Sequence, residues 1–192
     1  MDIQMKRAND YWSKILSQNV KKVDFEKESQ LEGTYKKTFT ISNNSFLLFN
    51  KITKGSKEMG LVLLQAALKV FAYKMYQSEF FIGMPQCTMD LKKNRQLLIS
   101  YSNNLNETWS IKELLQLEKG AFNELLLHQF YPTLELMEQN NCKEKVNLYI
   151  GMIDVHALES IMEIVNQMGM DITFLFDMKA DSLILDLYAS NG

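Results

Sequence analysis

The sequence is poor in the residues from which most small catalytic and metal-binding sites are built. It holds two cysteines, two histidines and two prolines among 192 residues. Cys87 and Cys142 lie far apart and belong to no CxxC or Cys/His ligand spacing. We therefore expect two small buried thiols, and neither a disulfide framework nor a metal centre. The glycines form neither a P-loop nor a GxGxxG turn, so the sequence predicts no nucleotide site.

The chain also lacks a large excess of charge of either sign and any long apolar run. The formal net charge is -2, which provides no general attraction for nucleic acid or for anionic lipid. The N-terminal residues MDIQMKRANDYW contain no apolar signal segment, and Gln65 and Lys69 interrupt the longest apolar stretch. We therefore expect a cytoplasmic protein without a membrane span. Because 46% of the residues are hydrophobic and 11% are aromatic, the composition is typical of one globular domain.

Helix and strand signals alternate along the chain without internal repeats, which favours an α/β layered domain. Periodicity predicts helices at 9–16, 45–51, 57–76, 110–129, 133–139 and 156–169, and strands at 34–42, 80–85, 96–102, 145–155, 171–179 and 181–190. The strand at 34–42 is predicted to be a surface or edge strand, and the last two strands to form an antiparallel hairpin. The charged segment 21–33 is predicted to be an exposed connector.

The helix at 57–76 has the clearest pattern. Ser56 is placed to cap its first turn, with Met59 in phase. Lys69 and Lys74 are expected on the faces that do not pack. The apolar side chains that recur every three or four residues are expected to pack on a sheet, and they are Leu61, Leu64, Leu68, Phe71, Ala72 and Met75.

Several segments follow one another in a recognisable order: YWSKIL, LLQAALKVFAYKMYQ, FFIGMPQ, HQFYPTLELM and MDITFLFDMKADSLILDLYAS. This order resembles the C-terminal lobe of the condensation domains of nonribosomal peptide synthetases. There, a YW helix precedes a capped LLxAAFxVLLxRYxGQ helix, an IGxP strand end, an HQxYPFExLV helix end and a terminal hairpin. The resemblance implies structural roles for the motif positions Gly83, Pro85, Gln86, His128, Gln129, Tyr131 and Pro132.

The resemblance extends from about Tyr11 to Tyr188 and implies both a fold and a domain organisation. The expected fold is α/β, a two-layer sandwich of a mixed β-sheet packed with long helices. It would be one lobe of the CoA-dependent acyltransferase-like fold, to which chloramphenicol acetyltransferase also belongs. Residues 1–192 would form a single condensation-like lobe, with an N-terminal helix and connector at 1–32 and a core at 33–192.

The chemistry of condensation domains depends on an HHxxxDG loop in their N-terminal lobe, whose second histidine acts as a general base or positions the attacking amine. This chain has only His128 and His156, and neither is followed by Asp and Gly at the required offset. The same comparison excludes the chloramphenicol acetyltransferase site. His128 is expected to cap a carbonyl, whereas His156 beside Asp154 fits a cap and turn as well as a dyad. We therefore predict no catalytic and no cofactor-binding residue. We also predict no metal-binding residue, since the spacing of Asp171, Asp177, Asp181 and Asp186 does not follow a calcium loop.

The sequence also departs from the family pattern. The segment CTMDLKKNRQLLISYS is shorter than the family's GFFVNT region, and its basic run at 92–95 stands where the family is apolar. NNCKEKVNLY occupies the position of the family's RDxSRNPLF, and the sequence ends at YASNG, where family members continue. These departures indicate either an excised piece of a longer protein or a remnant of a full condensation domain.

These features favour a truncated, non-catalytic lobe of a nonribosomal peptide synthetase. It would pack beside an adenylation domain, as a structural or interaction module in the biosynthesis of a peptide antibiotic or other secondary metabolite. The alternative is one half of a split condensation or acyltransferase enzyme, which forms amide bonds between carrier-bound substrates when another polypeptide supplies the HHxxxDG lobe. A stand-alone acyl-binding protein is a third hypothesis.

The partners that the resemblance implies are proteins. They are an adenylation domain or other synthetase domains, a carrier protein, a second lobe or a second copy of this chain, with neither nucleic acid nor membrane among them. No cofactor is expected in this lobe, although the carrier proteins of the family bear phosphopantetheine.

Overall fold

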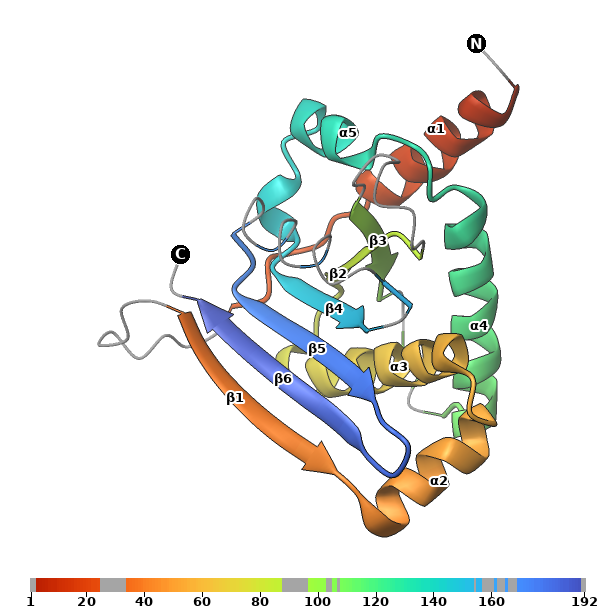
Figure 1. Cartoon of the computed structure of the whole chain (residues 1–192). Helices are drawn as coiled ribbons and strands as arrows, with labels where there is room; N and C mark the ends of the chain where they lie inside the picture. Colours follow the sequence, from red (N-terminus) through yellow and green to blue (C-terminus); the bar gives the residue numbers. More distant parts are fainter. Residues whose placement is uncertain are drawn as a thin grey trace.

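A six-stranded mixed β-sheet lies at the centre of the computed structural model (Figure 1). The structure describes residues 3–24, 34–87, 97–102, 105–106, 108–153, 155–156, 161, 165 and 169–190. The strand order is β1-β6-β5-β4-β2-β3. The strands are β1 (Thr34–Ile41), β2 (Phe81–Pro85), β3 (Leu97–Tyr101), β4 (Leu148–Met152), β5 (Ile172–Met178) and β6 (Leu183–Ser190). The predicted α/β class with a mixed sheet is therefore confirmed.

The middle of the sheet is parallel and its two sides are antiparallel. Strand β4 runs parallel to β2 and to β5, whereas β3 pairs antiparallel with β2. Strands β1 and β6 continue antiparallel beyond β5. Every residue of β2 and of β4 is buried, because both faces of these central strands are covered. Near-continuous apolar sequences such as FIGMP and LYIGM are typical of such strands.

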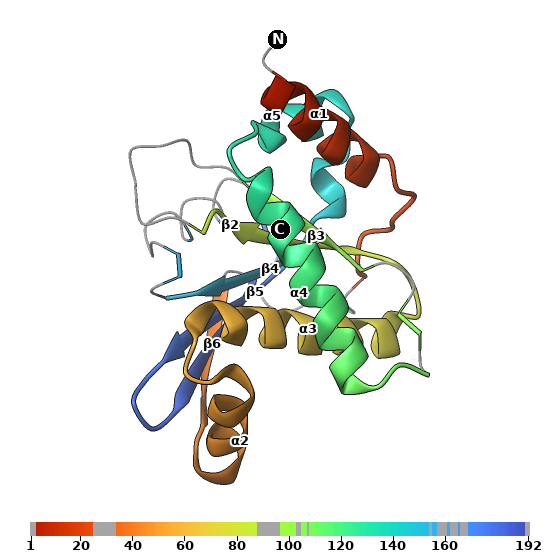
Figure 2. The same ribbon diagram turned by 90° about the vertical axis from the view of Figure 1, so that its right-hand side faces the viewer.

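The described helices are α1 (Ile3–Leu16), α2 (Asn43–Thr53), α3 (Lys57–Tyr76), α4 (Ile111–Leu127) and α5 (Thr133–Gln139), and a short 3-10 helix covers Lys143–Lys145. Helix α3 lies against the sheet and crosses α4, as Figure 2 shows from the side. Ser56 caps α3 as predicted, since its Oγ accepts a hydrogen bond from the amide of Met59. Ser110 and Glu113 form a reciprocal capping box at the start of α4. No helix among the described residues is long and apolar enough to cross a membrane.

The buried face of α3 differs from the predicted one. Phe71 and Met75, which were expected to pack, are 56% and 62% exposed, whereas Lys69 is 1% exposed. The prediction for these three residues is wrong because α3 turns a mixed polar and apolar face toward the core. Lys69 is accommodated there because both of its short contacts, 2.9 and 2.7 Å, are to the carboxylate of Glu118 on α4. Gln65, one turn earlier, donates to the hydroxyl of Ser100 on β3.

The segment that follows α1 is bound to the sheet. Val20 and Val23 are buried, and the amide and carbonyl of Val23 both bond to the side chain of Asn147. Lys22 pairs with Asp171 at 2.9 Å. The predicted exposed connector is therefore wrong at Val23, and its residues 25–33 lie outside the described residues.

The terminal hairpin is confirmed. Strands β5 and β6 pair antiparallel from Ile172 opposite Ala189 to Met178 opposite Leu183. The amide of Lys179 closes the turn by donating to the carbonyl of Ser182 at 2.9 Å. The basic run at 92–95 and most of the helix predicted at 156–169 lie outside the described residues.

Candidate functional site

Of the first three motif positions, Gly83 is the middle residue of β2, Pro85 is its last residue, and Gln86 follows it. A Cβ atom at Gly83 would lie 3.0 Å from the Leu97 side chain and 3.1 Å from the Tyr149 side chain, so a larger residue fits only if these neighbours shift. Pro85 is the last residue of β2 to pair, opposite Leu97. Glycine and proline therefore shape this strand end through packing and backbone geometry.

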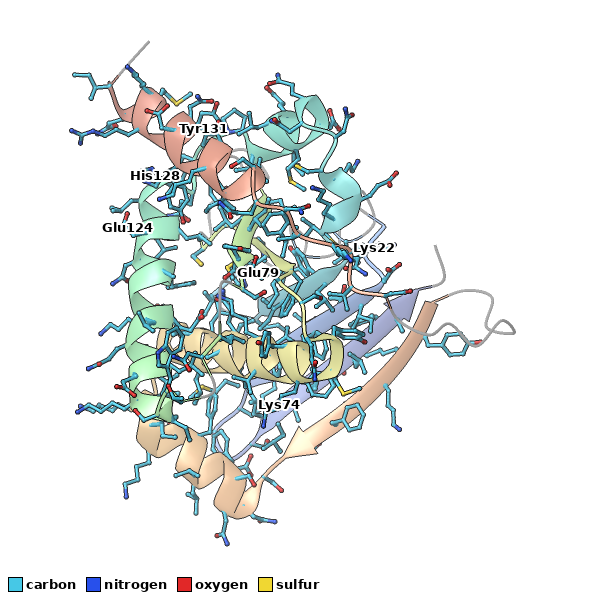
Figure 3. All side chains as sticks on the ribbon, turned by 180° about the vertical axis from the view of Figure 1, so that it is seen from behind. Lys22, Lys74, Glu79, Glu124, His128 and Tyr131 are labelled. Carbon is cyan, nitrogen blue, oxygen red and sulfur yellow. The ribbon has the colours of Figure 1, made fainter. Side chains whose placement is uncertain are left out.

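The second group of motif positions, His128, Gln129, Tyr131 and Pro132, forms the connection between α4 and α5. The amide of His128 bonds to the carbonyl of Leu125 at 3.1 Å, which closes α4. Pro132 precedes the first residue of α5, where its missing N–H removes no helical bond. Figure 3 shows the labelled side chains of Glu124, His128 and Tyr131 beside α1.

A direct hydrogen bond joins the two groups of motif positions. Gln86, which is buried, donates from its Nε2 to the backbone carbonyl of Gln129. Thr133 at the start of α5 donates to the carbonyl of Leu97, beside the same end of β2. A side chain that donates to a backbone carbonyl thus holds together two segments that lie 43 residues apart in sequence. We call this contact region, formed by 83–86 and 128–133, the motif junction.

Helix α1 docks on the motif junction through three polar and aromatic contacts. The fully buried indole of Trp12 donates from Nε1 to the carbonyl of His128 at 3.0 Å. The hydroxyl of Tyr131 donates to Oδ1 of Asn9 at 2.5 Å, and the ring of Tyr11 lies 4.4 Å from that of His128. The His128 ring therefore packs on an aromatic side chain. The carbonyl that accepts the hydrogen bond from Trp12 is the backbone carbonyl of His128 itself. The paired aromatics of the YW motif explain how the sequence fixes this helix in place.

The second histidine is held in one tautomer inside the protein. The Nδ1 atom of His156 accepts a hydrogen bond from the amide of Met152 at 3.0 Å. Burial lowers the pKa of His156 to about 3, so the ring is neutral and its single hydrogen is on Nε2. Nε2 lies 3.4 Å from Sγ of Cys87 and donates toward it.

This geometry makes Cys87 and His156 an unreactive pair. Burial, and next the charge of Glu58, raise the pKa of the Cys87 thiol to about 12. A Cys–His nucleophile needs a ring nitrogen that can accept the thiol proton, whereas the nitrogen facing Cys87 already carries one. Sequence separation hid this contact, because only the parallel pairing of neighbouring strands brings the ends of β2 and β4 together.

A cavity of about 490 Å³ adjoins the motif junction. It lies between α1, β3 and α4, and its walls include the side chains of Tyr11, Ile15, Tyr101 and Leu125, with Lys14 and Glu124 at its margin. Burial, and next the charge of Glu124, raise the pKa of Tyr11 to about 12, which keeps its hydroxyl protonated at neutral pH. Among the described residues the structure shows no ion pair for Lys14 or Glu124.

The absence of a metal-binding site stays a prediction. The acidic side chains that were considered for such a site have other roles in the structure. Among residues that the structure describes, no cluster of three or more His, Cys, Asp or Glu side chains could hold a metal. Asp171 is buried and accepts a hydrogen bond from Asn147 besides pairing with Lys22. Asp186 binds Lys36 at 2.8 Å, and Asp177 binds Lys179 at 2.5 Å.

Both cysteines are free thiols. Cys142 is buried, as predicted, whereas Cys87 is only partly buried, so the prediction of a buried thiol is wrong there.

Comparison of the whole structure with solved structures defines the class of fold. The chain matches about half the length of solved condensation domains of nonribosomal peptide synthetases, which corresponds to one lobe of the chloramphenicol acetyltransferase-like fold. The resemblance predicted from the motifs is thereby confirmed at the level of the fold. By sequence, no family model and no curated protein matches the chain.

Three solved structures illustrate the match. The starter condensation domain of rhizomide synthetase RzmA, in complex with C8-CoA, has a TM-score of 0.72 and 14% identity, and the match covers 98% of this chain and 47% of that chain. The first condensation domain of the calcium-dependent antibiotic synthetase, with a substrate analogue, has a TM-score of 0.72 and 9% identity, covering 98% and 46%. The cyclization-docking bidomain of EpoB from Sorangium cellulosum has a TM-score of 0.67 and 11% identity, covering 100% and 45%. The chain thus spans about half the length of these structures.

Proposed function

We propose that this chain is a non-catalytic condensation-like lobe of a nonribosomal peptide synthetase. It acts as a structural or interaction module beside an adenylation domain during the biosynthesis of a peptide natural product. The observation that carries the proposal is a match over nearly the whole chain that ends at about half of a condensation domain.

The state of the two histidines supports the non-catalytic part of this proposal. His156 is neutral, and its Nδ1 is occupied by a backbone amide. His128 packs on Tyr11 at the end of α4. A general base needs a free ring nitrogen within hydrogen-bond reach of the substrate and a group that orients it. Neither histidine has that arrangement among the described residues.

The motif junction supports a role in packing. Gln86 and Thr133 donate to backbone carbonyls, and the His128 carbonyl and the Tyr131 hydroxyl bond to α1. Such contacts hold α1 and the connection between α4 and α5 at the end of β2, and a module that positions a neighbouring domain requires fixed packing of this kind. The phosphopantetheine of a carrier protein would have to be bound by other parts of a synthetase under this proposal.

A second candidate is one half of a split condensation enzyme. The same match favours it, because the solved condensation structures contain about as much chain again as the part that this chain matches. In that case a separate polypeptide with the HHxxxDG loop would complete the active site, and this chain would provide one wall of the substrate channel.

One experiment separates the two candidates. The purified chain is mixed with an acyl-loaded and an amine-loaded carrier protein, with and without a separately expressed HHxxxDG-bearing lobe, and amide product is followed by mass spectrometry. We expect no product in either mixture and stable co-purification of the chain with an adenylation domain of the same synthetase. Product only with the added lobe would establish the split enzyme. Product from the chain alone would overturn both candidates.

A further inference from the structure

Strand β1 is the edge strand on one side of the described sheet. It pairs with β6 along its whole length, from Thr34 opposite Ser190 to Ile41 opposite Leu183. No strand of the described residues pairs with its other edge, and Figure 1 shows β1 as the outermost strand on that side. Alternate residues of an edge strand direct their N–H and C=O groups away from the sheet, so this edge can accept a further strand.

Two aromatic side chains of β1 are exposed beside this edge. Tyr35 and Phe39 are 45% and 40% exposed, and they lie on the same face because side chains alternate along a strand. Lysines commonly protect an edge from pairing. Here, Lys36 binds Asp186 on β6, and the ammonium of Lys37 lies 5.2 Å from the centre of the Phe39 ring. Both lysines are thus engaged by their own chain.

We propose that β1 pairs antiparallel with β1 of a second copy of this chain, around a two-fold axis through Thr38. A two-fold axis perpendicular to the sheet keeps each side chain on its own face, so the axis must pass through a residue. Residues whose numbers add to twice that of the central residue then lie opposite each other. With Thr38 at the centre the opposed pairs are Thr38 with itself, Lys37 with Phe39, Lys36 with Thr40, and Tyr35 with Ile41.

This register is self-complementary. An aromatic side chain faces a β-branched one, each Lys37 faces the Phe39 ring of the other copy, and no two like charges are directly opposed. A centre at Lys37 would place two ammonium groups opposite each other. A centre at Phe39 would leave Tyr35 opposite Asn43, which lies beyond β1 and has a positive φ of 55°. Only the centre at Thr38 therefore uses the strand from Tyr35 to Ile41 without a charge conflict.

Two substitutions at one residue test the register by sedimentation velocity of the full chain. Thr40 is exposed and lies opposite Lys36 of the other copy in both halves of the interface. We expect Thr40→Lys to raise the dimer dissociation constant by about tenfold, which corresponds to about 1.4 kcal/mol, and Thr40→Glu to lower it. Gln139→Lys on α5 adds the same charge at an exposed position far along the chain and should leave dimerisation unchanged.

A cross-linking experiment checks the axis directly. Thr38→Cys should form a disulfide-linked dimer under mild oxidation, because residue 38 lies opposite residue 38 of the second copy. Thr40→Cys should form much less of this dimer, because residue 40 lies opposite residue 36. The wild-type chain provides the background from its own two thiols, and circular dichroism verifies that each variant is folded. A wild-type chain that stays monomeric at all concentrations would overturn the proposal. The proposal would also be overturned if neither Thr40 substitution changed the dimer dissociation constant and Thr38→Cys formed no cross-linked dimer.

Discussion

The buried ion pair between α3 and α4 provides the sharpest test of the packing. Lys69 and Glu118 have side-chain exposures of 1% and 8%, and both carboxylate oxygens lie within 2.9 Å of Nζ. Burial lowers the pKa of Lys69, whereas the charge of Glu118 opposes this shift. Replacing Glu118 by Gln leaves the ammonium in the core without a counter-charge.

The expected loss is large. At 2.7 Å and an effective dielectric constant near 20, the attraction between the two charges is about 6 kcal/mol. Desolvation of both groups offsets much of it, and removal of one partner from a buried pair typically costs about 3–5 kcal/mol. For a chain of this size that loss lowers the melting temperature by roughly 6–20 °C. The double change Lys69→Met with Glu118→Leu removes both charges and should recover most of the loss.

Urea unfolding followed by circular dichroism measures these differences, and the single variants Lys69→Met and Glu118→Leu complete a double-mutant cycle. Lys74→Met is the matched control, because Lys74 is an exposed lysine on the same helix, and we expect a change below about 0.5 kcal/mol there. If Glu118→Gln changes stability as little as that control, or if the double variant is less stable than both single variants, the buried-pair reasoning is refuted.

Three further predictions concern other buried or capped positions. The pKa of His156 is about 3 in the folded state and about 6.5 in the unfolded state, so the folded state loses stability as the pH falls. From pH 7 to pH 5, protonation of His156 in the unfolded chain lowers the free energy of unfolding by about 2 kcal/mol. Urea midpoints of wild type and His156→Gln at both values should reveal that difference, and parallel pH profiles would contradict it. Gly83→Ala should destabilise the chain by about 1–3 kcal/mol through overpacking, measured by thermal unfolding; no loss would mean that Leu97 and Tyr149 can move aside. Ser110→Ala should cost about 1 kcal/mol by removing the cap of α4, and a Ser110→Asp variant that retains stability would show that capping is the cause.

The periodic segments of the chain were predictable because local patterns suffice for them. Ser56 and the apolar repeat after it identified α3, and the alternation in the last 20 residues identified the β5–β6 hairpin. The motif order led to the correct fold because it records the order of elements. The prediction that Phe71 and Met75 would be buried was wrong, since a helical period fixes which residues share a face but not which neighbour covers that face.

The candidate site was less accessible to sequence reasoning. His128, Gln129 and Tyr131 could be selected as motif positions, but their contacts with Asn9, Trp12 and Gln86 come from distant segments. The pairing of His156 with Cys87 likewise depends on β2 and β4 being neighbours. No local pattern contains such a contact, because it exists only once the strands have been ordered in the sheet.

The sequence by itself determined the class of fold, the order of its elements and the lack of a paired-histidine motif, since these follow from local periodicity and from the residues present. The tertiary structure alone decided that Lys69 is buried, that His156 is neutral with its proton on Nε2, and that β1 pairs with β6. The physical reason is that burial, protonation and strand pairing depend on which distant surfaces meet. A charge that is inexpensive in water becomes a strong constraint once another helix has excluded the solvent around it.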